Sequence, residues 1–118
     1  MKLTGLTISA LETQLQECLD LLEANGQVWA VDKAQYEDFE DKRKPMLATL
    51  MSRFDGSQAL KEQHAYETVD WQVYLRGLSE ARKSYYKSQV EYEQSKLKID
   101  VVRTLISTRR EEVKNFRG

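Results

Sequence analysis

The sequence has few of the residues that build compact catalytic sites or break helices. Its 118 residues include one proline, five glycines, one cysteine and one histidine. A lone cysteine excludes a disulfide framework and a multi-cysteine metal site, because both need several thiols. No apolar run approaches the roughly 18 residues that a membrane-spanning helix requires. The scarcity of helix breakers, together with 31% charged residues, predicts an all-α chain.

Two further features that the sequence lacks indicate the cellular compartment of the protein. The segment Met1–Thr4 lacks the apolar core of a signal peptide, and the single Cys18 has no second cysteine to pair with. We therefore expect a cytoplasmic protein. Cys18 occupies an apolar position of the pattern described next, so we interpret it as a small buried hydrophobe rather than a catalytic thiol.

Apolar side chains recur in both halves at alternating steps of three and four residues. Such steps place them on one helical stripe of period 3.5, which is the seam of a coiled coil. The second half carries the seam at Trp71, Tyr74, Leu78, Ala81, Tyr85, Ser88, Tyr92, Ser95, Ile99, Val102, Ile106, Arg109 and Val113, and the first half at Ile8, Leu11, Leu15, Cys18, Leu22, Asn25, Trp29, Asp32, Tyr36, Phe39, Arg43, Met46 and Leu50.

The strongest turn signal, Asp55-Gly56-Ser57, separates the two seams. Glycine can take a positive φ and the serine can cap a following helix. The sequence therefore predicts one domain, residues 1–118, folded as an antiparallel two-helix coiled-coil hairpin. Its helices should span about 9–54 and about 58–115, joined by a turn at 55–57.

Four local features mark the start and the weak points of these helices. Ser9-x-x-Glu12 is a capping box that predicts the helix start. The seam passes through Asn25-Gly26 without a phase shift, so we expect the helix to continue there. Pro45 removes a backbone hydrogen bond and predicts a bend at 41–45. Gly77 reads as a tolerated defect in the second helix.

Folding the chain at the turn predicts which residues face each other. Trp29 should meet Ala81, Leu11 should meet Ile99, and Tyr85 should lie opposite Asn25-Gly26, so that large side chains face small ones. Two charged seam residues should also pair. They are Arg43 and Glu67.

This pairing ends at about residue 102 and leaves the end of the second helix, residues 103–116, without an intrachain partner. A second apolar row lies on another face of the same helix, and one hairpin cannot cover both. We therefore predict self-association into a dimer or tetramer. The predicted oligomer interface is Tyr86, Val90, Leu97, Val101, Leu105, Ile106 and Val113.

Charge is unevenly divided between the halves. Residues 1–56 hold six Lys/Arg against ten Asp/Glu, and residues 57–118 hold twelve against nine. The basic residues of the second half form a row at spacings of seven or fourteen, which could follow phosphates or pair with acidic groups that set helix orientation. The candidate partner-binding or nucleic-acid-binding residues are Arg82, Lys96, Arg103, Arg110 and Arg117, with Lys114 beside them.

The sequence offers little for catalysis. It has no glycine-rich nucleotide loop, and its one histidine, His64, has Glu67 three residues on. A bundle metal site needs several carboxylates and two such motifs, so we interpret His64 as a seam residue. We expect no enzyme activity, no metal and no cofactor.

Three segments resemble small helical proteins encoded by tailed bacteriophages, often near genes for recombination or replication. The resemblance lies in Ala81-Arg82-Lys83-x-Tyr85, Tyr92-Glu93-Gln94-Ser95-Lys96-Leu97 and Arg103-Thr104-x-x-Ser107-x-x-Arg110-x-Glu112-Val113. It implies an accessory protein in the host cytoplasm, with no catalytic residues to carry over.

The favoured function is a non-enzymatic, oligomeric coiled-coil accessory protein that mediates protein–protein interaction, with a partner in DNA metabolism. Two alternatives stay open. One is direct DNA or RNA binding through the basic row. The other is a structural virion component or a secreted hairpin.

Overall fold

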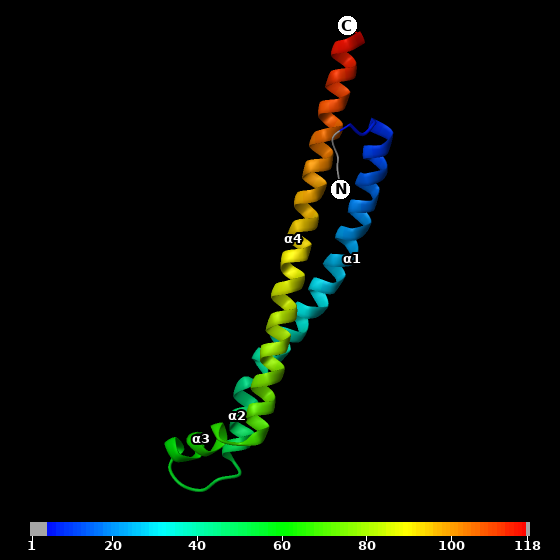
Figure 1. Ribbon diagram of the computed structural model, residues 1–118. Coiled ribbons are helices and arrows are strands. Elements are labelled where there is room, and N and C mark those ends of the chain that lie inside the picture. The colour runs from blue at the N-terminus through cyan, green and yellow to red at the C-terminus, as the bar shows by residue number, and fades with distance from the viewer. Residues whose placement is uncertain (1–4, 118) are drawn as a thin grey trace. The chain divides into compact units, whose positions relative to one another are not determined.

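The computed structural model describes residues 5–117, without the side chains of residues 116 and 117. Over that range the backbone forms four α-helices and no strand (Figure 1). They are α1 (Ile8–Asp41), α2 (Arg43–Met51), α3 (Gln58–Tyr66) and α4 (Val69–Arg117). The predicted all-α fold class is confirmed.

The chain divides into two compact units. We call residues 1–29 and 88–118 the terminal unit, and residues 30–87 the central unit. The core of the terminal unit consists of Leu11, Cys18, Ile99, Val102 and Ile106. The core of the central unit consists of Leu50, Ala65, Trp71, Tyr74 and Leu78.

Both predicted seams are the inward faces of their helices. Every seam position on α4 is buried or half-buried except Val113, and every one on α1 and α2 is so except Arg43. In the terminal unit the contacts between α1 and α4 run in opposite directions along the two helices. Glu12 meets Arg110 near one end, and Asn25 meets Ser95 further along. The helices of this unit are therefore antiparallel.

The start of α1 differs from the predicted capping box. The Ala10 amide donates to Thr7 Oγ1 at 3.1 Å, and the Leu11 amide donates to the Thr7 carbonyl at 2.9 Å. Thr7 therefore caps the helix, and Ser9 lies inside its first turn. The prediction missed Thr7 because it followed the Ser-x-x-Glu spacing and overlooked a threonine two residues earlier.

The boundary between α1 and α2 lies inside the segment where the sequence predicts a bend. Lys42 separates the two helices, and Pro45, with no amide hydrogen, follows within the first turn of α2. The Tyr74 hydroxyl donates a hydrogen bond to the Phe39 carbonyl near the end of α1. Burial raises the pKa of Tyr74 above its ordinary value.

The connection between α2 and α4 is longer than predicted. Ser57 caps α3 through its Oγ, which accepts from the Leu60 amide at 3.2 Å, and Gly56 has a φ of +117°. Helix α3 then stops, and Thr68 starts α4. Its Oγ1 accepts from the Trp71 amide at 3.1 Å and donates to the Ala65 carbonyl at 2.7 Å. The predicted continuous helix from residue 58 is thus interrupted at residues 67–68.

The predicted pairing of the helices is wrong by seven to eleven residues. In the terminal unit, the ring of Tyr92 stacks on Trp29 with centroids 5.4 Å apart, and it also covers Gly26. A Cβ at Gly26 would lie 3.1 Å from Tyr92 Cε2. The residue facing Gly26 is therefore Tyr92 and not Tyr85, and the partner of Trp29 is not Ala81. Such shifts are sums of three- and four-residue steps and again place seam residues opposite seam residues, so the pattern alone could not detect the error.

The unpartnered end of the last helix is consequently shorter than predicted. Val102 is fully buried, Ile106 packs in the core of the terminal unit, and Arg110 reaches Glu12 on α1. Residues 103–110 therefore do have intrachain contacts. Ile106 is a core residue and not part of an oligomer interface.

Two predictions for the central unit also need correction. Arg43 is exposed, and no ion pair among residues 5–117 joins it to Glu67. Gly77 is not a tolerated defect, because a Cβ there would lie 2.8 Å from Cε1 of Phe39. The Phe39 ring fills the space that a side chain at position 77 would need.

We predict that Ile106→Ala lowers the free energy of unfolding by about 2–5 kcal/mol, because it empties a packed site. Ile106 is 5% exposed, whereas Val113, the control position on the same seam, is 43% exposed. Val113→Ala should cost less than about 1 kcal/mol. Urea unfolding followed by circular dichroism measures both, and equal costs would contradict this placement of the core.

Candidate interaction surface

An exposed apolar row lies on α4 in the terminal unit. Val90, Leu97 and Val101 are 55%, 65% and 51% exposed. Their spacing of seven and four places them on one face of the helix. The seam residues Ser95 and Ile99, between them in sequence, are buried. This outer row, Val90, Leu97 and Val101, therefore points away from α1.

The other members of the predicted interface have different environments. Val113 is exposed, and Leu105 is half-buried against the core of the terminal unit. Tyr86 belongs to the central unit, where its exposed ring lies 5.3 Å from the ring of Tyr85 and 6.4 Å from that of Tyr36. Only part of the predicted interface is thus available to a partner.

Exposed apolar residues that were not predicted from the sequence lie on α1. Leu21 and Val28 are exposed, lie seven residues apart and belong to the terminal unit. The seven-residue spacing of Leu21 and Val28 indicates a second apolar row beside the seam. The prediction for this helix considered only the seam residues.

The central unit contains a groove that was not predicted from the sequence. Its volume is about 610 Å³. Arg53 and Asp70 line it and form an ion pair of 2.7 Å. The other lining residues are Phe39, Lys42, Met46, Thr49, Val73, Tyr74 and Gly77. Phe39, Met46 and Val73 give the groove an apolar wall.

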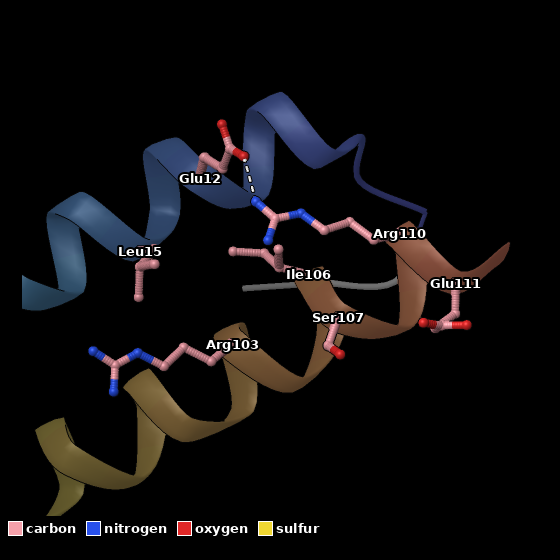
Figure 2. Close-up of a pocket in the computed structure, with 7 residues that line it drawn as sticks. All are labelled: Glu12, Leu15, Arg103, Ile106, Ser107, Arg110 and Glu111. Carbon is pink, nitrogen blue, oxygen red and sulfur yellow. Dashed lines mark hydrogen bonds and ion pairs between the residues drawn. The ribbon is translucent and has the colours of Figure 1, made fainter. Parts of the chain in front are cut away.

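The basic row is largely engaged with acidic or aromatic side chains of the same unit. Figure 2 shows Arg110 reaching across to Glu12, with a 3.1 Å ion pair, in a groove of about 380 Å³. Arg103 and Ser107 line the same groove. Arg103 is exposed, and the structure shows no ion pair for it.

Arg82 and Lys96 also have close partners. In the central unit Arg82 lies 3.8 Å from Glu40 and 5.8 Å from the centre of the Tyr36 ring. Its hydrogen bond with Tyr36 raises the pKa of the guanidinium above the usual value. In the terminal unit Lys96 lies 3.3 Å from Glu93 and 4.4 Å from the centre of its neighbouring aromatic ring, Tyr92.

Lys114 and Arg117 are the last two members of the row. Lys114 is exposed, and the side chain of Arg117 lies outside the described residues. Three members of the row therefore pair with a carboxylate, and two of these pairs, at Glu12 and Glu40, cross between helices. This arrangement matches charges that set helix orientation better than a free track for phosphates.

The residues considered for catalysis or metal binding are His64, Glu67 and Cys18. His64 Nδ1 lies 3.9 Å from Glu67 Oε2, and its ring stacks on Phe54. Among the described residues, no group of three or more His, Cys, Asp or Glu is placed to hold a metal ion. Cys18 is buried in the core of the terminal unit. No helix in residues 5–117 has both the length and the apolar content to cross a membrane.

Comparisons with protein-family models, with curated proteins and with solved structures found no match. The assignment of a role therefore rests on the exposed surfaces, the grooves and the charges described above.

We predict a small coupling energy between Glu12 and Arg110, about 0.2–1 kcal/mol, because both side chains are largely exposed. A double-mutant cycle with Glu12→Gln and Arg110→Gln, followed by urea unfolding, measures it. The value should fall as salt is added. The matched cycle with Arg103→Gln should show no coupling, and equal coupling in both cycles would contradict the assigned pair.

Proposed function

We propose that this protein is a non-enzymatic, cytoplasmic coiled-coil hairpin that self-associates and mediates protein–protein interaction. The observation that carries the proposal is the outer row, Val90, Leu97 and Val101, which is exposed along one face of α4. Aligned apolar side chains on the outside of a helix mark an interaction surface.

The outer row is long enough for a helix-to-helix contact. Val90 and Val101 are eleven residues apart, which is about 16 Å along the helix axis. Full burial of a Val or Leu side chain is worth about 1.5–3 kcal/mol, so three of them supply several kcal/mol against the cost of association.

A second copy of the chain is a suitable partner for the outer row. A two-fold axis between Ser95 and Lys96 would place antiparallel copies of α4 so that Val90 of one faces Val101 of the other. An isologous contact of this kind uses the same patch twice and closes on itself. The product is a dimer, and Leu21 and Val28 offer a further apolar row for a tetramer.

The resemblance to bacteriophage helical proteins suggests the biological process in which this protein acts. We propose an accessory role in the host cytoplasm, with a recombination or replication protein as the partner. The interhelical pairs Arg110–Glu12 and Arg82–Glu40 support a protein partner over nucleic acid, because they engage two cations that phosphates would need.

Direct nucleic-acid binding is the second candidate function. Arg103 and Lys114 favour it, since both are exposed and the structure shows no ion pair for either. If the protein binds DNA or RNA, Arg103→Glu should weaken that binding and reduce its salt dependence, because it removes one phosphate contact. We expect fluorescence anisotropy with single-stranded and duplex DNA to show no binding before or after the change.

We predict that Leu97→Glu with Val101→Glu converts the wild-type oligomer to a monomer, because each change places a charge in the apolar contact. Sedimentation equilibrium measures the mass. Ser107→Glu, an exposed change that lies beside the groove with Glu12 and not on the outer row, is the control and should leave the mass unchanged. A wild-type chain that remains monomeric at high concentration would overturn self-association.

A further inference from the structure

Asn25 and Gly26 are neighbours on α1, and both contact α4 within the terminal unit. Asn25 Nδ2 donates a 2.6 Å hydrogen bond to Ser95 Oγ. The Tyr92 ring covers Gly26, where a Cβ would lie 3.1 Å from it. The packing of α1 against α4 therefore uses an amide side chain at one position and the absence of a side chain at the next.

An asparagine followed by glycine is also chemically reactive. The backbone nitrogen of Gly26 can attack Cγ of Asn25, because glycine has no side chain to hinder the approach and its backbone turns freely. The N–Cγ bond of a succinimide ring forms, the Cγ–Nδ2 bond breaks, and ammonia leaves with the amide hydrogen of Gly26. Water then opens the ring at one of its two carbonyl carbons. The product is aspartate or isoaspartate, and no oxidant or reductant is needed.

The folded terminal unit holds the reacting atoms in an unreactive arrangement. Gly26 lies inside α1, where its amide hydrogen belongs to the helical hydrogen-bond ladder. Ring closure would turn the backbone of Asn25 out of its helical conformation. The leaving nitrogen, Nδ2, is bonded to Ser95. Water is close by, because Asn25 and Ser95 line a groove of about 330 Å³, so the conformation and not the lack of water prevents the reaction.

The product does not restore the native contact. Ser95 Oγ donates its hydrogen to the Glu91 carbonyl at 2.9 Å, so it accepts from the side chain at position 25. An aspartate there would place a second acceptor oxygen against Ser95 Oγ. An isoaspartate would add a carbon atom to the backbone and interrupt the helical ladder. Either product therefore opposes the closed contact between α1 and α4.

From these contacts we infer that Asn25-Gly26 is a spontaneous modification site, and that the contact between α1 and α4 controls its deamidation. While the contact is closed, the site does not react. Glycine inside a helix is a weak point, so local unwinding of α1 at Gly26 exposes the pair to cyclisation. Loss of ammonia makes the change permanent. This inference does not depend on the proposed function.

Peptide mapping by mass spectrometry measures the deamidation of Asn25 while the full chain is incubated at neutral pH. We expect the folded chain to react at least roughly tenfold more slowly than the same chain in guanidinium chloride, because only the opened state cyclises. The other asparagine of the sequence, Asn115, precedes the bulky Phe116. It is an internal reference that should react slowly in both solutions.

Ser95→Ala removes the acceptor that holds Asn25. It should speed deamidation of the folded chain about two- to tenfold, the range expected for one lost hydrogen bond. The matched control is Thr104→Ala, which removes a hydroxyl that, like that of Ser95, donates to a carbonyl four residues earlier on α4. This control should leave the rate unchanged. In guanidinium chloride both variants should react at the wild-type rate.

Asn25→Asp reproduces the aspartate product. It should lower the midpoint of urea unfolding, measured by circular dichroism. The same change in a Ser95→Ala background should lower the midpoint less, because the hydrogen bond between the two side chains is already absent there.

A folded chain in which Asn25 deamidates as fast as in guanidinium chloride would overturn the inference, whether or not Ser95→Ala folds. Equal rates in folded Ser95→Ala and Thr104→Ala would overturn the control assigned to the Asn25–Ser95 contact. An Asn25→Asp chain that unfolds at the wild-type midpoint would show that the product does not oppose the closed contact.

Discussion

The contact on which the structure depends is an aromatic ring seated on a glycine of the facing helix. Tyr92 covers Gly26 in the terminal unit, and Phe39 covers Gly77 in the central unit. Neither glycine has a positive φ, so each is required for space and not for an unusual backbone conformation. Because a Cβ at either position would crowd the ring, these contacts permit two helices to approach closely with large aromatic side chains between them.

This packing determines which surfaces are free for partners. With the seam buried, the apolar residues left on α4 of the terminal unit are those of the outer row, and most of the described basic row lies against acidic or aromatic neighbours. Exposed cations for which the structure shows no ion pair remain on α4, at Arg76, Lys87, Lys98, Arg103 and Lys114, whereas the exposed apolar residues of the outer row share one face of the helix. A helical face that is apolar along its length is suited to helix-to-helix association.

Much of the architecture could be predicted from the sequence, because a 3-4 spacing reports directly which face of a helix is buried. The seam residues, the all-α class and the boundary between α1 and α2 near Pro45 could all be predicted in this way. The register of α1 against α4 could not, since heptad patterns match equally well after a shift of seven. It depends on the helix break at Thr68, which lengthens the connection between α2 and α4 and was not predicted. Likewise, Arg110 was predicted as free because its partner, Glu12, faces it only in the correct register.

The central claim is the register of α1 against α4 in the terminal unit, and electron spin resonance distances test it most directly. One spin label at Asp20 is combined with a second at Glu93, Asp100 or Ser107, three exposed positions that share one helical face and lie seven residues apart. Double electron–electron resonance, with Cys18 replaced, measures each distance. The structure predicts that the Asp20–Asp100 pair is the shortest of the three. A shortest distance for Asp20–Glu93 would contradict the register on which the account rests.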